Sequence, residues 1–301
     1  MSVVPHLVQY QGSKRMIAED ILKHIPEGTV RLIEPFSGTG AVSILAAYTK
    51  KCDSFWLNDI NKPLIQMIET CVNNPDELAE EYAKVWEGQF AEGQNNVDYF
   101  YTVREAFNGG TQDAARMLFL LARVVKGAVR YNSQGQMNQS CDKRRFGTKP
   151  IVVKKNAHGI SKLLKGKTTF TNIDYREVLR MAKPGDLVYM DPPYQGTSNK
   201  DNTRDNRYIQ GVDFDEFVEA LHDLNQRGVN YIVSYDGMTG DRQIGNMLPD
   251  SLNLTHIFIN AGLSAQSLLN GKKEITFESL YLSPNLKLGE DDFTQLKFEL
   301  A

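Results

Sequence analysis

Residues 30–48 read VRLIEPFSGTGAVSILAAY, and the fold that we predict is built outward from them. Residues 30–33 suit a short buried strand, and the apolar run over 41–48 suits a buried helix. A loop with two glycines joins them, and a second strand, expected over 55–58, ends at Asp59. Strand, glycine loop, helix, strand and acid, in this order, are typical of the first half of a doubly wound nucleotide-binding α/β fold.

The second half of the chain returns to the same alternation. Its apolar runs predict strands over 168–171, 187–190, 231–235, 251–259 and 275–282, and helices over 175–181 and 214–227. We therefore predict a Rossmann-like α/β sheet with helices on both of its faces.

The middle of the chain has a different character. Helical patterns are expected over 76–86, 97–107 and 113–125. Residues 127–170 are rich in Gly, Asn, Gln, Lys and Arg and show little periodicity, so loops with short elements are expected there. The predicted organisation is one α/β domain, formed by 1–75 and 166–301, with a helical and basic insert at 76–165.

Composition excludes several other classes. The 301 residues are 41% hydrophobic and 24% charged, which indicates a packed globular domain. No apolar run reaches the roughly 18 residues that span a bilayer, and we see no secretory signal. The three cysteines lie far apart and the five histidines are scattered, so we expect no disulfide framework and no metal site, and a cytoplasmic setting.

The glycine loop predicts the chemistry of a cofactor. Gly38 and Gly40 lie just before the expected helix, where backbone N–H groups can contact a ligand. Ser43, however, stands where a dinucleotide-binding loop has its third glycine. Glu34 opens the loop with a carboxylate, which disfavours a pyrophosphate and favours a ligand with a positive centre. Phe36 adds an apolar surface beside it.

Two later acids and one lysine complete the predicted cofactor site. Asp59 ends the second strand and is placed to accept ribose hydroxyls, and Asp174, at the end of the third, could accept from an adenine amino group. Lys14 could pair with a carboxylate of the cofactor or of the site. A solvated lysine and a helix-capping Asp59 are the plainer alternatives. The set fits S-adenosyl-L-methionine, which combines an adenosine, a sulfonium and an amino acid without phosphate.

The sequence Asp191-Pro192-Pro193-Tyr194 follows the expected strand over 187–190. Prolines end a strand because they lack an N–H group. The Asp191 carboxylate and the Pro192 carbonyl would then form a pair of acceptors, with the Tyr194 ring beside them. This arrangement suits a planar group that carries an NH2, such as a nucleobase, although a rigid turn with a structural tyrosine is also consistent.

These motifs together resemble the Dam-like N6-adenine DNA methyltransferases, in the alpha-group order with cofactor motifs first and the catalytic motif last. The resemblance covers about residues 7–282 and rests on YQGSK at 10–14, EPFSGTG at 34–40, NDIN at 58–61, RYN at 130–132, NIDY at 172–175 and DPPY at 191–194. It implies a methyltransferase sheet with a target-recognition insert. It also implies that Tyr10, Lys14, Asp59 and Asp191 bind S-adenosyl-L-methionine.

The family resemblance implies further roles for the matched residues. Phe36, Gly38 and Gly40 would lie under the methionine part of the cofactor, and Asp191 to Tyr194 would be the catalytic tetrapeptide. The implied reaction moves a methyl group to N6 of an adenine flipped out of duplex DNA. A restriction-modification system, with a cognate endonuclease, is the setting that we expect.

Charge in the insert supports a DNA partner. The net charge of the whole chain is −3, but residues 116–167 contain 13 Lys or Arg and one acid, Asp142. Arg130 is our candidate for a base contact, because arginine reads guanine with two hydrogen bonds. The other candidates are Lys126 and Asn132, together with Lys143, Arg144 and Arg145 as phosphate contacts.

Three other functions remain open at this point. An RNA base or a protein glutamine amide offers the same planar NH2 to the strand-end motif, but a basic insert favours duplex DNA. A binding module without catalysis would predict damage to the acids or the glycine loop, and these are intact. A nicotinamide oxidoreductase is disfavoured by Ser43 and Glu34.

Overall fold

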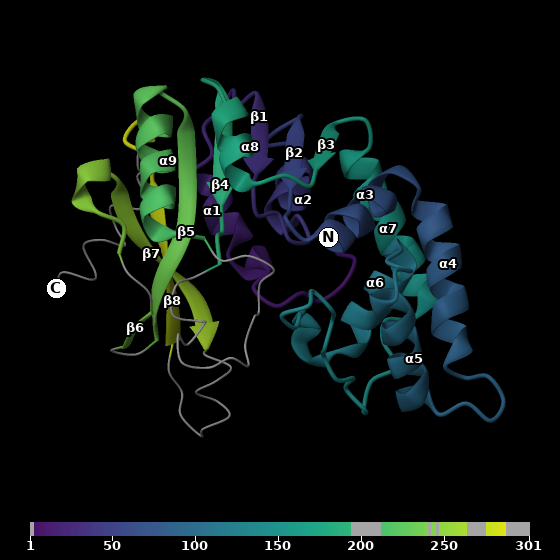
Figure 1. The fold of residues 1–301 in the computed structure, drawn as a ribbon. Coiled ribbons are helices and arrows are strands. Elements are labelled where there is room, and N and C mark those ends of the chain that lie inside the picture. Colours follow the sequence, from purple (N-terminus) through teal and green to yellow (C-terminus); the bar gives the residue numbers. More distant parts are fainter. Residues whose placement is uncertain (1–2, 194–211, 240–241, 245–246, 264–274, 287–301) are drawn as a thin grey trace.

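The computed structural model describes residues 3–193, 212–239, 242–244, 247–263 and 275–286 (Figure 1). Within them the strands are β1 (Arg31–Glu34), β2 (Phe55–Asn58), β3 (Thr168–Thr171), β4 (Asp186–Met190), β5 (Asn230–Thr239), β6 (Arg242–Ile244), β7 (Thr255–Leu263) and β8 (Ile275–Leu282). They form one sheet in the order β3-β2-β1-β4-β5-β8-β7, with β6 beside β5.

The helices connect these strands and form the insert. They are α1 (Ala18–Lys23), α2 (Ala41–Tyr48), α3 (Lys62–Asn73), α4 (Pro75–Gly88), α5 (Asn96–Asn108), α6 (Ala114–Arg123), α7 (Pro150–Leu164), α8 (Tyr175–Met181) and α9 (Phe214–Gln226). Short 3-10 turns are η1 (Lys14–Met16), η2 (Val125–Gly127) and η3 (Asp250–Leu252). Among the described residues no helix is long and apolar enough to cross a membrane.

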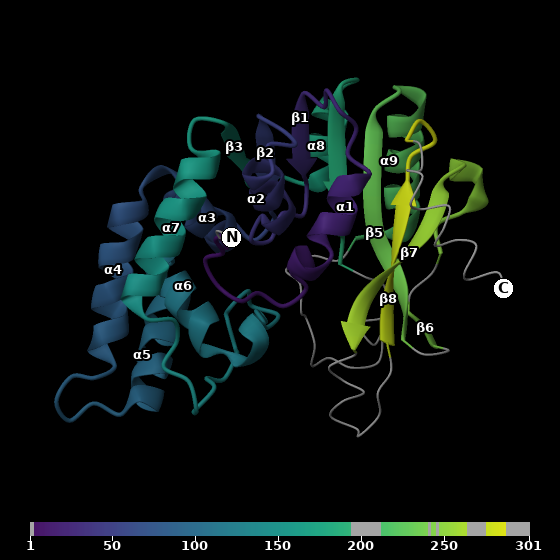
Figure 2. The same ribbon diagram turned by 180° about the vertical axis from the view of Figure 1, so that it is seen from behind.

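Two apolar layers cover the two faces of the sheet. Leu32, Leu187 and Ile232 point to one face and belong to the same buried cluster as residues of α1, α2 and α3. Their strand neighbours Val188 and Tyr231 point to the other face, in the cluster with α8 and α9. Figures 1 and 2 show these helices on opposite sides of the sheet. The predicted doubly wound α/β fold is confirmed.

The strand order predicts a binding crevice at the carboxyl ends of the central strands β1 and β4. β1 pairs in parallel with both β2 and β4, and β4 pairs in parallel with β5. The chain therefore leaves β1 to one side first and returns to its other side later. In open α/β sheets this switch point is where ligands bind, beyond the carboxyl ends of the strands. Here those ends are Glu34, the last residue of β1, and Asp191, which follows β4.

The insert is more helical than its composition indicates. The prediction of loops over 127–170 is wrong for 150–164, which form α7. Pro150 begins this helix, and Val153, Ala157, Ile160 and Leu164 are all buried at helical spacing against the main core. The many lysines between these positions hide that periodicity.

Candidate active site

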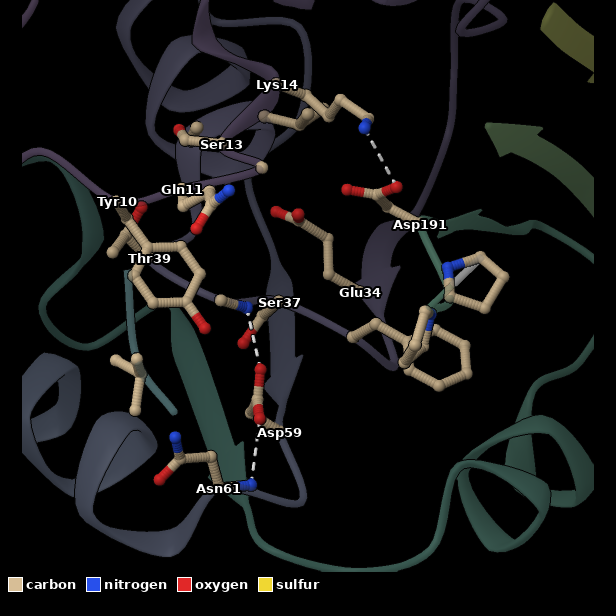
Figure 3. A pocket seen from close by; sticks show the side chains of 18 of the residues that line it. Tyr10, Gln11, Ser13, Lys14, Glu34, Ser37, Thr39, Asp59, Asn61 and Asp191 are labelled. Atoms are coloured by element: carbon tan, nitrogen blue, oxygen red, sulfur yellow. Dashed lines mark hydrogen bonds and ion pairs between the residues drawn. The ribbon is translucent and has the colours of Figure 1, made fainter. Parts of the chain in front are cut away.

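A pocket opens at the switch point between β1 and β4. Its walls come from five separated segments of the chain: 10–14, 34–42, 59–61, the pair Val129 and Tyr131, and 189–193. The empty space between the lining atoms, counting the open mouth, is about 940 Å³. Figure 3 shows the acidic side chains and Lys14 arranged around it.

The glycine loop is shaped by close approach on two sides. Gly38 has φ of 52°, and a Cβ there would lie 3.3 Å from Cε1 of the Tyr10 ring. Gly40 has φ of 67° and caps α2, and a Cβ there would lie 3.1 Å from Cδ1 of Leu57. Gly38 lines the pocket, whereas Gly40 does not line it and instead packs close to Leu57. Glycine is required at both positions because L side chains rarely adopt these angles.

Asp59 holds the loop in place. Its Oδ2 accepts a hydrogen bond from the Gly38 N–H at 2.9 Å, and its Oδ1 accepts one from the Asn61 N–H at 2.8 Å (Figure 3). Burial raises the pKa of Asp59 to about 6, although both hydrogen bonds oppose this effect. Each carboxylate oxygen has a second lone pair, so Asp59 can still accept from ligand hydroxyls.

Glu34 is a buried carboxyl at the base of the pocket. Its side chain is 3% exposed, and its Oε1 accepts the Ser43 N–H at 2.8 Å. Burial raises the pKa of Glu34 to about 7, and the nearby Asp191 carboxylate adds to this. Ser43, which replaces the third glycine of a dinucleotide loop, thus binds the acid that opens the loop.

Lys14 joins the N-terminal segment to the strand-end motif. Its Nζ lies 3.0 Å from Oδ1 of Asp191 and 3.3 Å from Oε2 of Glu278, and its side chain is 7% exposed. The other oxygen of Asp191 points toward the interior of the pocket (Figure 3). The sequence prediction that Lys14 pairs with carboxylates of the site agrees with this geometry, but Glu278 was not foreseen.

The tetrapeptide is placed in part. Asp191, Pro192 and Pro193 line the pocket, as their position after β4 predicts. Tyr194 lies outside the described residues.

Asp174 does not line this pocket. It caps α8 by accepting the Arg176 N–H at 2.9 Å, and both of its oxygens contact the Arg176 guanidinium. The hydrogen bonds from Arg176 hold the pKa of Asp174 below its usual value. The side chain lines a neighbouring hollow that shares Phe36, Ile60 and Pro193 with the main pocket.

The insert reaches the pocket through a tyrosine that sequence reasoning did not select. The Tyr131 hydroxyl donates to Asn61 Oδ1 at 3.1 Å, and both residues line the pocket. Burial raises the pKa of Tyr131 to about 12, so it is neutral and able to donate. Tyr131 lies in the RYN motif of the family resemblance, and this motif was the feature of the sequence that could have identified it.

The DNA-binding candidates fall into two groups. Arg130 and Asn132 adjoin the pocket residue Tyr131 along the chain, and Lys126 lies earlier, on η2. Tyr131 pairs with Met137 across a short antiparallel bridge. The Asn132 side chain accepts from the backbone of residues 134 and 136, so it shapes this turn. Lys143, Arg144 and Arg145 are exposed on the following loop, where Asp142 contacts both arginines.

The charges of the pocket define the class of ligand. Its charged lining residues are Lys14 and three acids, Glu34, Asp59 and Asp191. This set repels a pyrophosphate and suits a cationic nucleoside ligand, and it stands beside a strand-end acceptor pair. Fold and site together define a Rossmann-like methyltransferase.

The particular family follows from comparison with known proteins. The family model described as D12 class N6 adenine-specific DNA methyltransferase matches residues 10–272, and this chain belongs to that family. The predicted Dam-like family is therefore confirmed. The family and the fold imply a cofactor of the S-adenosylmethionine type, and the family implies a DNA substrate.

The similar proteins carry matching names. The chain is 29% identical over 247 residues to a DNA N-6-adenine-methyltransferase of Escherichia phage P1, covering 79% of this chain and 30% of that protein. It is 30% identical over 190 residues to a DNA adenine methylase of Serratia marcescens, covering 62% and 66%. It is 28% identical over 266 residues to the Retron Ec67 DNA adenine methylase of Escherichia coli, covering 85% and 83%. The chain thus spans less than a third of the phage relative.

Proposed function

We propose that this chain transfers a methyl group from S-adenosyl-L-methionine to N6 of an adenine that is extruded from duplex DNA. The observation that carries the proposal is the meeting of two motifs in one pocket. The Asp191-Pro192 acceptor pair lies across the same cavity as Glu34, Gly38 and Asp59. Donor and acceptor of the methyl group therefore have places next to each other.

The acidic residues would hold the cofactor. Glu34 is suited to its positive amino-acid end, and Asp59 to the ribose hydroxyls. Tyr10 and Phe36 would pack against it, with Gly38 and Gly40 allowing close backbone approach. Lys14 and Asp191 complete the wall. Asp174 would take part through the neighbouring hollow, where its contacts with Arg176 compete with an adenine amino group.

The strand-end residues would activate the adenine. When bound, S-adenosyl-L-methionine supplies a methyl group on a positively charged sulfur. The N6 lone pair of adenine is delocalised into the ring, which makes N6 a poor nucleophile. Asp191 and the Pro192 carbonyl would accept both N6 hydrogens and direct the lone pair at the methyl carbon. Asp191 is then placed to take the proton that N6 loses after the transfer, and Tyr194 would stack on the base.

The insert at 76–165 would recognise DNA, and 1–75 with 166–301 would perform catalysis. Lys126, Lys143, Arg144 and Arg145 are suited to phosphates, and Arg130 and Asn132, next to the pocket, to the bases around the target. Extrusion of the base is required because N6 in a stacked duplex cannot reach the pocket.

The test is methyl transfer from isotopically labelled S-adenosyl-L-methionine to unmethylated duplex DNA, followed by nucleoside mass spectrometry. The expected product is N6-methyladenine. Label in cytosine, in RNA or in a protein glutamine amide, with none in adenine of DNA, would overturn the proposal. The RNA and protein arms test the alternative substrates directly.

A restriction-modification setting is the further part of this proposal. It predicts that DNA from cells expressing the chain is protected from a restriction endonuclease that cuts the methylated site. Sequencing that maps N6-methyladenine would identify the site. If the methylated DNA is cut by every endonuclease that recognises this site, the restriction-modification part of the proposal is contradicted, but methyl transfer is not.

A further inference from the structure

Glu278 contacts the pocket residue Lys14 although no catalytic or cofactor motif contains it. It lies on β8, two strands away from β4 in the sheet, and its Oε2 is 3.3 Å from the Nζ of Lys14. The same Nζ lies 3.0 Å from Asp191. One buried ammonium therefore joins two carboxylates that come from distant parts of the chain.

Two features of the sheet determine the position of Glu278: the alternation of side chains along β8 and a bulge in the neighbouring strand β5. Side chains alternate along a strand, so Glu278 shares a face with Leu280 and Leu282, which are fully buried in the layer that contains residues of α1. Ser234 pairs with Leu280 but Gly237 pairs with Glu278, so β5 uses one more residue than β8 over this interval. Such a bulge bends a strand and redirects its neighbours, often next to active sites.

A buried carboxylate oxygen is costly unless it is paired. The Oε2 atom of Glu278 is buried, and the Lys14 ammonium compensates it. A purely structural pair would satisfy this requirement anywhere on the sheet. Here the partner is the same lysine that contacts Asp191, and both of these residues line the pocket.

Lys14 needs a second anchor to orient Asp191. A lysine has a flexible four-carbon stem and an ammonium without directional shape, so a single contact does not fix its position. Glu34 presents another carboxylate on the pocket side of Lys14 (Figure 3). Loss of the Glu278 carboxylate would remove one of the two carboxylates that contact the Lys14 ammonium, and with it part of the restraint on Lys14.

We propose that Glu278 is a positioning residue for methyl transfer: it holds the Lys14 ammonium, and Lys14 in turn holds Oδ1 of Asp191 so that the other oxygen faces the target amine. This inference rests on the proposed function. It assigns Glu278 an effect on the rate of transfer that passes through Lys14.

The experiment is a double-mutant cycle in single-turnover methyl transfer, with saturating cofactor and DNA. Glu278→Gln keeps the size of the side chain and is expected to slow transfer about tenfold, because small displacements of reacting groups have large effects on rate. Cofactor affinity and the midpoint of thermal unfolding are expected to stay near those of the wild type. Lys14→Met is expected to slow transfer more, and adding Glu278→Gln to it to change the rate by less than about twofold.

Several results would overturn the inference. One is a wild-type rate in Glu278→Gln, and another is the same tenfold loss in the Lys14→Met background, which would make Glu278 independent of Lys14. If Glu278→Gln does not fold, Glu278→Asp keeps the charge but shortens its reach, and a wild-type rate there contradicts positioning.

A matched control removes a carboxylate from another lysine pair. Glu81 contacts Lys84 on the exposed surface of α4, and Glu81→Gln is expected to transfer methyl at the wild-type rate. Failure of the proposed function would look different, because the wild type itself would then leave adenine unmethylated.

Discussion

The ammonium of Lys14 lies 3.0 Å from Oδ1 of Asp191, although one residue precedes the first helix and the other follows the fourth strand. This contact ties the N-terminal segment to the carboxyl end of β4. It occupies one oxygen of Asp191 and leaves the other directed at the pocket (Figure 3). The geometry suits a carboxylate that must meet an incoming amine in one orientation.

Replacing Asp191 by alanine should abolish most of the methyl transfer and leave the fold intact. The change removes one of two acceptors for the N6 hydrogens, so we expect a loss of about 100-fold to 1000-fold in the single-turnover rate. Lys14 keeps its contact with Glu278, so thermal unfolding should shift little. Asp191→Ala protein with normal turnover would contradict the mechanism.

Cofactor affinity should fall as the pH is lowered from 8 to 6. Burial raises the pKa of Glu34 to about 7 and that of Asp59 to about 6, and a cationic ligand with donor hydroxyls needs both as carboxylates. Protonation of Glu34 alone should weaken binding about tenfold at pH 6. Calorimetric titration measures this. Glu34→Gln should remove the step near pH 7 and leave only the weakening near pH 6, and a flat profile in the wild type would contradict the role of Glu34.

The same glutamate should destabilise the protein at high pH. Its folded-state pKa, about 7, lies above its ordinary value of 4.5, so its contribution to stability is full below pH 4.5 and is lost as the pH rises through 7. At pH 8 the Glu34→Gln protein should therefore be about 3 kcal/mol more stable to urea than the wild type. The difference should shrink toward pH 5, and Glu219→Gln, on the exposed face of α9, serves as the control.

Gly127 should be required for the insert to meet the N-terminal segment. Its φ is 62°, and an added Cβ would lie 1.9 Å from the backbone oxygen of Gln9. The Gln11 N–H also donates to the Gly127 carbonyl at 3.2 Å. Gly127→Ala should cost about 3 kcal/mol of unfolding free energy, because backbone must move. Gly135→Ala, with φ of 73° and nothing within 4 Å, should cost about 1 kcal/mol. Equal losses in urea unfolding would refute the steric argument.

Two basic residues should differ in their effect on DNA. Arg130→Ala should relax the choice of sequence, since Arg130 stands beside the pocket, whereas exposed Lys143→Ala should weaken all DNA alike and reduce the salt slope by about 1. Fluorescence anisotropy at several salt concentrations separates these outcomes. Lys183 lies before the amino end of β4, away from the pocket. The Lys183→Ala protein is the control and should bind DNA as the wild type does. A change of sequence choice in Lys143→Ala would contradict the assignment.

The residues of the cofactor side were predictable because their signals are local. Glu34, Gly38 and Asp59 stand at the ends of short apolar runs, and parallel strands bring their carboxyl ends to one edge. Predicting the α/β alternation was enough to place them together. The helix α7 was missed because its buried positions are separated by lysines, so composition concealed the period.

Local patterns in the sequence were enough to predict the α/β alternation, the glycine turns and the acids at strand ends, since these depend on neighbours along the chain. Two contacts depend on long-range packing: Tyr131 donates to Asn61, and Glu278 shares Lys14 with Asp191. The last contact depends on the register of β8 against β5 and on one extra residue in β5. A shift of one residue would turn Glu278 to the other face of the sheet, and no local pattern in the chain specifies that register.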